Sequence, residues 1–131
     1  MLGGPLAAHL GAGEELLDDA DHLDGAADEG EHAAFDSAGS HFNPDDSDHP
    51  DHAGDMPPLL VMEDGKAKTS FLTDRFTPAD LGGDQGTAVM IHAGPDNFAH
   101  IPERYAPAPD EDSLKTGDAG DRVGCGVVET A

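Results

Sequence analysis

The sequence predicts an all-β fold in which four short strands are joined by long loops. The first two strands are an apolar run at residues 58–62 and an alternating segment at 67–73, separated by an Asp-Gly turn. Residues 87–92 and 122–128 are two further short apolar runs that follow glycine-containing segments. Runs of this length that are bounded by turn residues are typical of strands.

The connections between these strands carry their own signals. Asp64-Gly65 is the dipeptide preferred at the centre of a tight hairpin turn. Residues 77–81 predict one capped helical turn, because Pro78 occupies its first helical position. Glycines end this turn before the third strand, and residues 93–121 are expected to form a long loop.

Residues 1–33 are predicted to be an acidic segment of low order that precedes a domain over residues 34–131. Within this segment, residues 14–23 place leucines and an alanine on one side of a helix and acids on the other. The acids of the last turn oppose the helix dipole. We therefore expect a short, marginal helix in a largely disordered segment.

The charge balance excludes two classes of partner. The chain has 28 Asp and Glu against 6 Lys and Arg, a formal net charge of −22. Binding to nucleic acids or to anionic membrane surfaces needs basic patches, so neither is expected. No apolar run approaches the length needed to cross a bilayer, and the start lacks the basic and apolar regions of a signal peptide.

Three histidines and one aspartate gather at His41, His49, His52 and Asp55. Gly and Pro interrupt this stretch, so a folded loop is expected rather than a regular helix. A loop can turn several imidazoles and one carboxylate toward a single point, and such a set suits a closed tetrahedral zinc site. Composition alone also produces such groupings in a chain with 8 His, so a solvated acidic loop without metal is the alternative.

Three segments carry a resemblance to a known family. Residues 40–44 read Ser-His-Phe-Asn-Pro, and residues 52–55 read His-Ala-Gly-Asp. Residues 89–97 read Val-Met-Ile-His-Ala-Gly-Pro-Asp-Asn, and residues 117–128 place an arginine three residues before a cysteine. In this order they resemble the metal loop, the copper-histidine strand and the final strand of copper/zinc superoxide dismutases, over about residues 34–128.

The resemblance implies a Greek-key β-sandwich, of which this chain carries what resembles the second half. Residues 98–105 look most like the actinobacterial branch of the family. Bacterial members are usually exported to the periplasm or cell envelope, although no signal peptide is expected here. The resemblance leaves a homo-oligomer open.

The resemblance also implies roles for individual residues. His92 would be a copper ligand, and His41 the imidazolate that bridges copper to zinc. The zinc site would be completed by the other three residues of the loop: His49, His52 and Asp55. Asp96 would orient histidines of both metals through hydrogen bonds, and Arg122 would guide the incoming superoxide anion.

The sequence departs from the family in two places. Family copper sites draw two further ligands from an upstream His-x-His pair, which this sequence lacks; His9, His22 and His32 stand singly. The family pairs the cysteine matching Cys125 in a disulfide, and its partner is also absent. Cys125 is therefore expected to be a free thiol packed as a small hydrophobe.

The preferred interpretation is a superoxide dismutase that converts superoxide to oxygen and hydrogen peroxide at a copper site supported by zinc. The alternative is a non-catalytic zinc-binding β domain with a degenerate copper site, which the absent His-x-His favours. A third hypothesis, an acidic protein that binds a basic partner, rests on charge alone.

Overall fold

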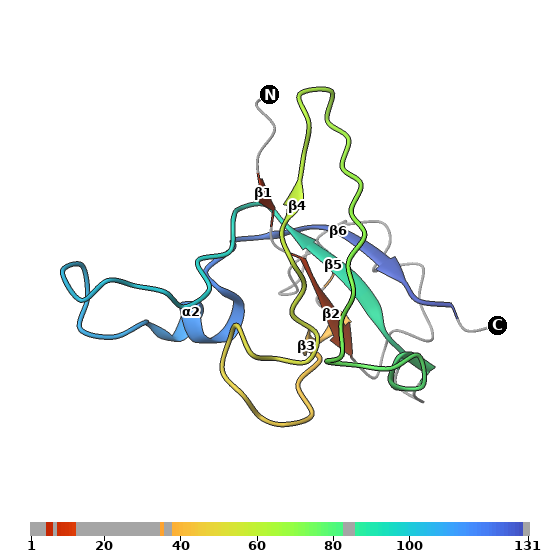
Figure 1. The fold of residues 1–131 in the computed structure, drawn as a ribbon, viewed down its shortest axis with the longest axis horizontal. Helices are drawn as coiled ribbons and strands as arrows, with labels where there is room; N and C mark the ends of the chain where they lie inside the picture. Colours follow the sequence, from red (N-terminus) through yellow and green to blue (C-terminus); the bar gives the residue numbers. More distant parts are fainter. Residues whose placement is uncertain (1–4, 7, 13–34, 36–37, 83–85, 130–131) are drawn as a thin grey trace, which may run out of the picture.

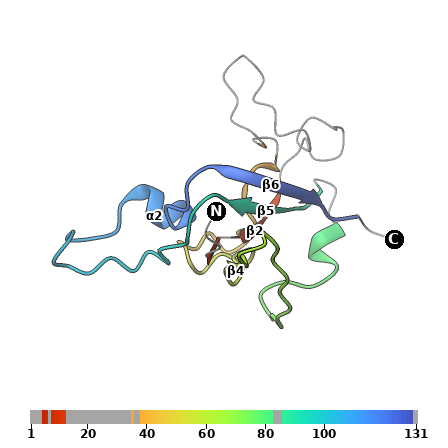
Figure 2. The same ribbon diagram turned by 90° about the horizontal axis from the view of Figure 1, so that it is seen from above.

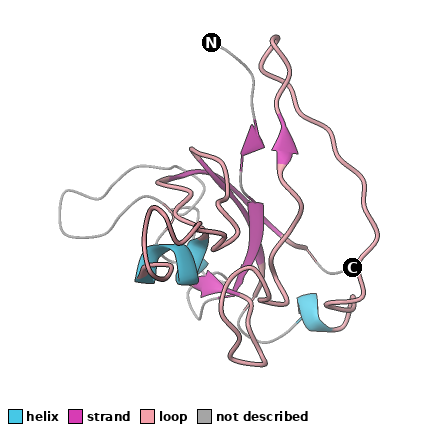
Figure 3. Cartoon of the chain, turned by 60° about the vertical axis from the view of Figure 1, so that its left-hand side comes forward, coloured by secondary structure: helices cyan, strands magenta, loops and turns pink. Residues whose placement is uncertain are grey.

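The computed structural model describes residues 5–6, 8–12, 35, 38–82 and 86–129. Over these residues the chain forms short strands and little helix, joined by long loops (Figures 1 and 3). The predicted all-β class is confirmed.

The larger sheet contains four antiparallel strands in the order β3-β2-β5-β6. In this spatial order the strands are Ser40–His41, Ala8–Ala12, Ala88–His92 and Arg122–Val127. Figure 1 shows β2, β5 and β6 side by side in the middle of the molecule. Two of the three pairings join consecutive strands through long connections, whereas β2 and β5 pair although two other strands lie between them in the sequence, a crossover of the kind that Greek-key folds contain.

A smaller sheet pairs β1 (Pro5–Leu6) with β4 (Leu59–Leu60). The strand predicted at 58–62 is therefore present, but only two of its residues pair. The expectation of low order before residue 34 is wrong for β1 and β2, which both belong to sheets. The helix predicted at 14–23 lies outside the described residues.

The core is small and is built on the alternation of β5. Ala88, Met90 and His92 are buried on one face of the strand, and the two residues between them are half-buried. Met90 is fully buried. Three residues from other parts of the chain pack in the same cluster: Phe35, Ala38 and Cys125.

The single cysteine is a free thiol, half-buried against this cluster. Burial raises the pKa of Cys125, and the nearby charge of Arg122 partly offsets that effect. The predicted unpaired and packed thiol is confirmed.

A β-bulge interrupts the pairing of β5 with β6. Ile91 lies opposite Gly124, yet the next residue, His92, lies opposite Arg122, which leaves Val123 as an extra residue in β6. Bulges of this kind bend a strand and re-aim side chains, often next to functional sites. Here the bulge puts Arg122 rather than Val123 across from His92.

The hairpin predicted after β4 forms only its turn. The amide of Gly65 donates to the carbonyl of Met62, and the amide of Met62 donates to the carbonyl of Lys66. Residues 67–73 are loop, so the strand predicted there is wrong. Leu72 is fully exposed, and alternation without a surface to pack against does not hold a strand in place.

Two helical pieces lie at opposite ends of the molecule (Figures 1 and 2). The turn predicted at 77–81 is a short 3-10 helix, η2 (Asp80–Gly82), which Asp80 caps by accepting from the amide of Thr77 at 2.7 Å. The predicted loop 93–121 also contains a helix, α2 (Glu111–Thr116). Neither described helix is long and apolar enough to span a membrane.

Candidate metal centre

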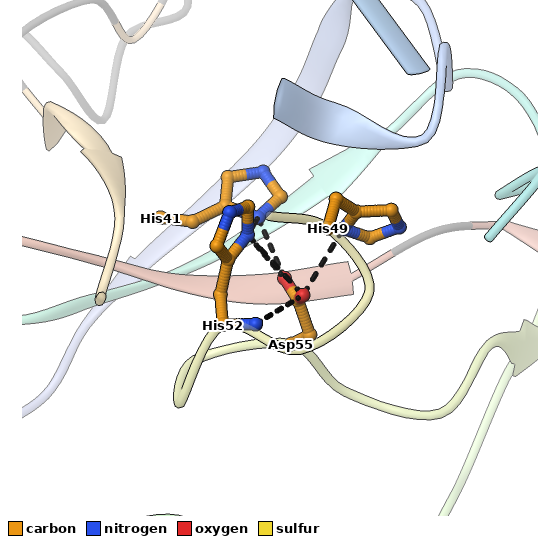
Figure 4. Close-up of side chains that lie close together, drawn as sticks. All are labelled: His41, His49, His52 and Asp55. Atoms are coloured by element: carbon orange, nitrogen blue, oxygen red, sulfur yellow. Dashed lines mark hydrogen bonds and ion pairs between the residues drawn. The ribbon is translucent and has the colours of Figure 1, made fainter. Parts of the chain in front are cut away.

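Four side chains of the loop, which we call the metal-loop cluster, converge on one point (Figure 4): His41, His49, His52 and Asp55. Asp55 is at its centre: Oδ1 is 2.7 Å from His41 Nδ1, and Oδ2 is 3.0 Å from His49 Nδ1. The Nδ1 atom of His52 is 3.2 Å from Asp55 Oδ2 and also 3.2 Å from His41 Nδ1. One ligand atom from each of the four residues lies within 4.8 Å of every other.

Local hydrogen bonds give the loop this shape. The amide of Gly54 donates to the carbonyl of Phe42 at 2.8 Å and closes the loop just after β3. The Asn43 side chain holds a turn within the loop. Its Nδ2 donates to the carbonyl of Ser47 at 2.8 Å, and its Oδ1 accepts from the Ser47 amide at 3.0 Å. Asn is a common turn residue because its side chain makes such bonds.

Two other parts of the chain hold the loop from outside. The amide of His49 donates to the carbonyl of Leu114 in α2 at 2.8 Å. Arg75 donates through Nη1 to the carbonyls of Pro50 and His52, at 2.8 and 3.2 Å. The sequence did not indicate this role for Arg75, because nothing local to it marks the contact.

Asp96 supports the cluster through His49. Its Oδ1 accepts from His49 Nε2 at 2.7 Å and from the amide of Phe98 at 2.7 Å. Gly117 passes so close that a Cβ atom there would lie 1.9 Å from this Oδ1 and 2.7 Å from His49 Nε2. The bond through Nε2 fixes the orientation of the His49 ring and leaves Nδ1 facing the cluster.

The electrostatics of the cluster favour an anionic carboxylate. Burial acts to raise the pKa of Asp55, but hydrogen bonds from His41 and His49 hold it far below its usual value. Burial lowers the pKa of His41 and keeps that ring neutral at neutral pH. Burial also acts to lower the pKa of His49, but its bonds to Asp55 and Asp96 outweigh this and raise it.

This donor set fits zinc. A tetrahedral zinc site with bonds of about 2.0–2.1 Å places its ligand atoms about 3.3 Å apart. The shorter separations among these donors, 2.7 to 3.2 Å, are close to that value, and all four ligand atoms lie within 4.8 Å of one another. The Nδ1 atoms of His41 and His52 face each other at 3.2 Å. Because a neutral imidazole carries only one N–H, both Nδ1 atoms can present a lone pair, and this arrangement suits a shared cation.

His92 lies next to the cluster, on β5. Its ring centroid is 6.3 Å from that of His41. Its Nδ1 donates to the carbonyl of Gly120 at 2.8 Å, which leaves Nε2 as the ring nitrogen able to bind a metal. Burial lowers the pKa of His92, the hydrogen bond with Gly120 opposes this, and the charge of Arg122 adds to the lowering.

Arg122 faces His92 across the bulge. Its guanidinium donates to the carbonyl of Phe35 at 2.7 Å and to the carbonyl of Gly39. It lines an open pocket of about 350 Å³ together with His41, His52 and Lys115. Asp46 and Asp48 line the same pocket and Lys115 is ion-paired with Glu111 at 2.5 Å, so it is Arg122 that brings positive charge next to His92.

The structure brings the seven predicted site residues to one region. His41, His49, His52 and Asp55 form one cluster, while Asp96 and His92 adjoin it and Arg122 lines the same pocket as His41.

Of the functional features that the sequence did not reveal, α2 is the main one. Its signals are local: Asp110 accepts from the amide of Ser113 at the start, and Gly117 ends the helix with φ of 67°.

Comparison with known proteins gives a consistent result. The sequence model of the family described as copper/zinc superoxide dismutase matches residues 20–128. The chain is 48% identical over 100 residues to a Cu-Zn superoxide dismutase of Mycolicibacterium paratuberculosis, a match that covers 72% of this chain and 44% of the relative. The enzyme of Mycobacterium tuberculosis is also 48% identical, over 72% of this chain and 42% of the relative.

More distant proteins match as well. A Cu-Zn superoxide dismutase of Schizosaccharomyces pombe is 36% identical over 72% of this chain and 61% of the relative. A solved structure of the clock protein EA4 aligns with a TM-score of 0.63 at 27% identity, over 97% of this chain and 71% of that one. The chain spans less than half the length of the mycobacterial relatives that it matches.

Proposed function

The chain belongs to the copper/zinc superoxide dismutase family, and we propose that it converts superoxide to oxygen and hydrogen peroxide at a copper ion beside a zinc ion. The observation that carries this proposal is the position of His41. It contributes Nδ1 to the metal-loop cluster, and its ring lies 6.3 Å from that of His92. A single imidazole between a zinc position and a copper position can provide one ring nitrogen to each.

Zinc would be held by the Nδ1 atoms of His41, His49 and His52 and by the carboxylate of Asp55. The role of this zinc ion would be structural, because four protein ligands leave no open position for a substrate. Asp96 keeps His49 aligned, and Gly117 leaves the room for that contact.

Copper would be held by His41 and by Nε2 of His92. When bound, it supplies the one-electron oxidation and reduction that disproportionation requires. The Gly120 carbonyl fixes the ring orientation and tautomer of His92. Imidazole nitrogen is a suitable ligand type for copper.

Arg122 has the role of attracting and positioning the substrate anion. A net charge of −22 repels superoxide from the molecule as a whole. The guanidinium is held by two backbone carbonyls, so its charge stays beside His92 rather than moving into solvent.

The non-catalytic zinc-binding domain is the second candidate. It is favoured by the contrast between a four-ligand zinc cluster and a copper position for which the described side chains offer only His41 and His92. The two candidates differ in whether copper adds activity to the zinc-loaded protein.

The test follows superoxide decay with zinc-loaded protein, before and after copper is added and free copper removed by a chelator. Wild type is compared with His92→Ala, with Arg122→Glu and with Arg104→Glu, which makes the same charge change at an exposed arginine stacked on Tyr105. We expect a copper-dependent rate that His92→Ala abolishes. Arg122→Glu should reduce it more than Arg104→Glu, most at low ionic strength.

Metal content serves as the control. Asp55→Ala should lose zinc, whereas Asp45→Ala, at an exposed position of the same loop, should keep it. Equal copper-dependent rates in all four proteins would assign the activity to adventitious copper and overturn the proposal. Zinc binding with no copper-dependent rate would establish the second candidate instead.

A further inference from the structure

One side chain joins a long projection of the chain to the metal loop (residues 42–55). Figure 1 shows the chain leaving the sheets after β4 and running back along this projection, which we call the arm (residues 61–75). All of its residues except the first are exposed. At its end, Arg75 donates through Nη1 to the carbonyl of Pro50 at 2.8 Å and to that of His52 at 3.2 Å.

Both bonds fall in the part of the loop that carries three of the four predicted zinc ligands. Residues 49–55 contain His49, His52 and Asp55, and the accepting carbonyls lie between the first and the last of them. The carbonyl of His52 also accepts from the amide of Asp55 at 3.1 Å, and the amide of His52 donates to Asp55 Oδ2 at 3.1 Å. Arg75 is therefore bonded to the turn that sets these two ligands relative to each other.

Packing contributes little on this side of the loop. A pocket of about 340 Å³ is lined by Pro50 and Asp55 of the loop and by Phe71 and Leu72 of the arm. Side chains on opposite sides of such a pocket are too far apart for van der Waals attraction. Arg75 lines the same pocket, and its hydrogen bonds connect the two sides.

The charge of Arg75 does not explain its position. A cation next to a zinc site disfavours zinc by Coulomb repulsion, and Asp51, whose Oδ1 is 3.7 Å from Nη2, partly offsets that charge. The side chains of Arg75 and Asp51 are 41% and 77% exposed, so solvent screens both charges. The remaining contribution is geometric, because one nitrogen with two N–H groups fixes two carbonyls of the loop.

We propose that Arg75 is a positioning residue of the zinc site. It holds the backbone between His49 and Asp55 in the shape that binds zinc, and zinc binding in turn fixes the end of the arm. The second effect follows from the first, because coupling between two sites is reciprocal. The inference rests on the proposed function in one respect, namely that the metal-loop cluster binds zinc, and its test needs neither copper nor activity.

The first test measures zinc affinity by competition with a chelator. Methionine has a similar length to arginine but no donor, so Arg75→Met should lower zinc affinity about tenfold, as expected when a residue that supports a ligand is lost. Arg75→Lys keeps N–H donors and should recover part of this loss. Arg104→Met is the matched control and should bind zinc like wild type, because it removes the same charge from an exposed arginine stacked on Tyr105.

Cobalt(II) in place of zinc reports the geometry of the site, because its visible absorption depends on the arrangement of its ligands. In cobalt-saturated Arg75→Met we expect a weaker or shifted band, and in Arg75→Lys a band closer to that of wild type. A role in stability alone would lower the melting temperature and leave the band of the saturated protein unchanged. Repulsion as the main effect of Arg75 would make Arg75→Met bind zinc more tightly than wild type.

A measurement on the wild type covers the case in which Arg75→Met fails to fold. Hydrogen exchange of residues 70–76 should be slower with zinc than without it, because zinc strengthens the bonds of Arg75. The turn at residues 102–106, closed by the bond from the Tyr105 amide to the Pro102 carbonyl, is the control and should exchange equally in both states.

The outcomes separate the two proposals. Zinc affinity in Arg75→Met that equals or exceeds that of Arg104→Met, or a lower affinity with an unchanged cobalt band, overturns the role of Arg75 and leaves the proposed function standing. Equal exchange of residues 70–76 with and without zinc also overturns it. A wild-type protein that binds no zinc overturns both proposals. Weaker zinc binding with an altered cobalt band, partly restored by lysine, supports the positioning role.

Discussion

Among single residues, Gly117 supports the metal centre without offering a ligand. Its φ of 67° is unfavourable for other residues by about 1–2 kcal/mol. In addition, a Cβ there would lie 1.9 Å from Asp96 Oδ1 and 2.7 Å from His49 Nε2. Both the helix end and the support of His49 therefore require glycine.

We predict that Gly117→Ala lowers both thermal stability and zinc affinity. Gly65→Ala is the matched control, because Gly65 has φ of 80° but no atom within 4 Å of the position of a Cβ. It should lose stability by about the backbone cost alone and bind zinc like wild type. Melting curves with and without zinc measure the two effects, and equal zinc affinity in the two variants would contradict the close contact.

Zinc ligation could be predicted from the sequence because the relevant information is local. His41, His49, His52 and Asp55 lie in one loop, and their residue types indicate the chemistry before any fold is known. Arg75 and Gly117 could not be found in this way. Their contributions are a hydrogen bond and a close approach to distant residues, and neither leaves a mark in the surrounding sequence.

At the scale of elements, α2 holds the metal loop through a backbone hydrogen bond. The helix has one turn and a half, so its ends decide whether it forms. Asp110 caps the start by accepting from the Ser113 amide at 2.9 Å. The carbonyl of Leu114 then accepts from the amide of His49, so the cap acts on the metal loop through the helix.

Replacing the cap should therefore weaken zinc binding from a distance. We predict that Asp110→Ala lowers the melting temperature and zinc affinity, while Asp110→Asn keeps both because Asn also caps. The bond with Ser113 lowers the pKa of Asp110, so its stabilisation is present above the usual Asp pKa and is lost as pH falls through the lowered one. Zinc titrations at neutral pH test the first part; indistinguishable Asp110→Ala and Asp110→Asn proteins would refute it.

Strands were predicted well where both partners have strong patterns and poorly elsewhere. Residues 87–92 and 122–128 were recognised, and they pair with each other as β5 and β6. Residues 67–73 alternate but find no partner. Residues 8–12 were missed, because their small residues and glycine give a weak local signal and their place in the sheet comes from pairing with β5.

For the molecule as a whole, charge is the dominant property. The net charge of −22 is carried by a chain with a small core of Ala, Met and half-buried neighbours. Mutual repulsion destabilises a compact state, and salt screens it over a Debye length of about 10 Å at 0.1 M. The domain boundary predicted at residue 34 and export from the cell stay predictions.

We predict that the melting temperature of the zinc-loaded protein rises with sodium chloride between low and moderate ionic strength. The expected direction follows from the excess of acidic residues and is opposite to that of a protein stabilised mainly by surface ion pairs. Differential scanning calorimetry at fixed pH and zinc concentration measures it. A melting temperature that falls with added salt would show that ion pairs such as Arg75 with Asp51 outweigh the repulsion.

The hydrogen bond between the amide of His49 and the carbonyl of Leu114 has a consequence for the order of events during translation. The ribosome produces all four zinc ligands well before it produces α2, and synthesis proceeds at about 5–20 residues per second. During that interval the nascent loop has its donors but not the helix, the Asp96 carboxylate or the Arg122 side chain that anchors the preceding turn. We therefore expect firm capture of the metal only once the final strand has emerged.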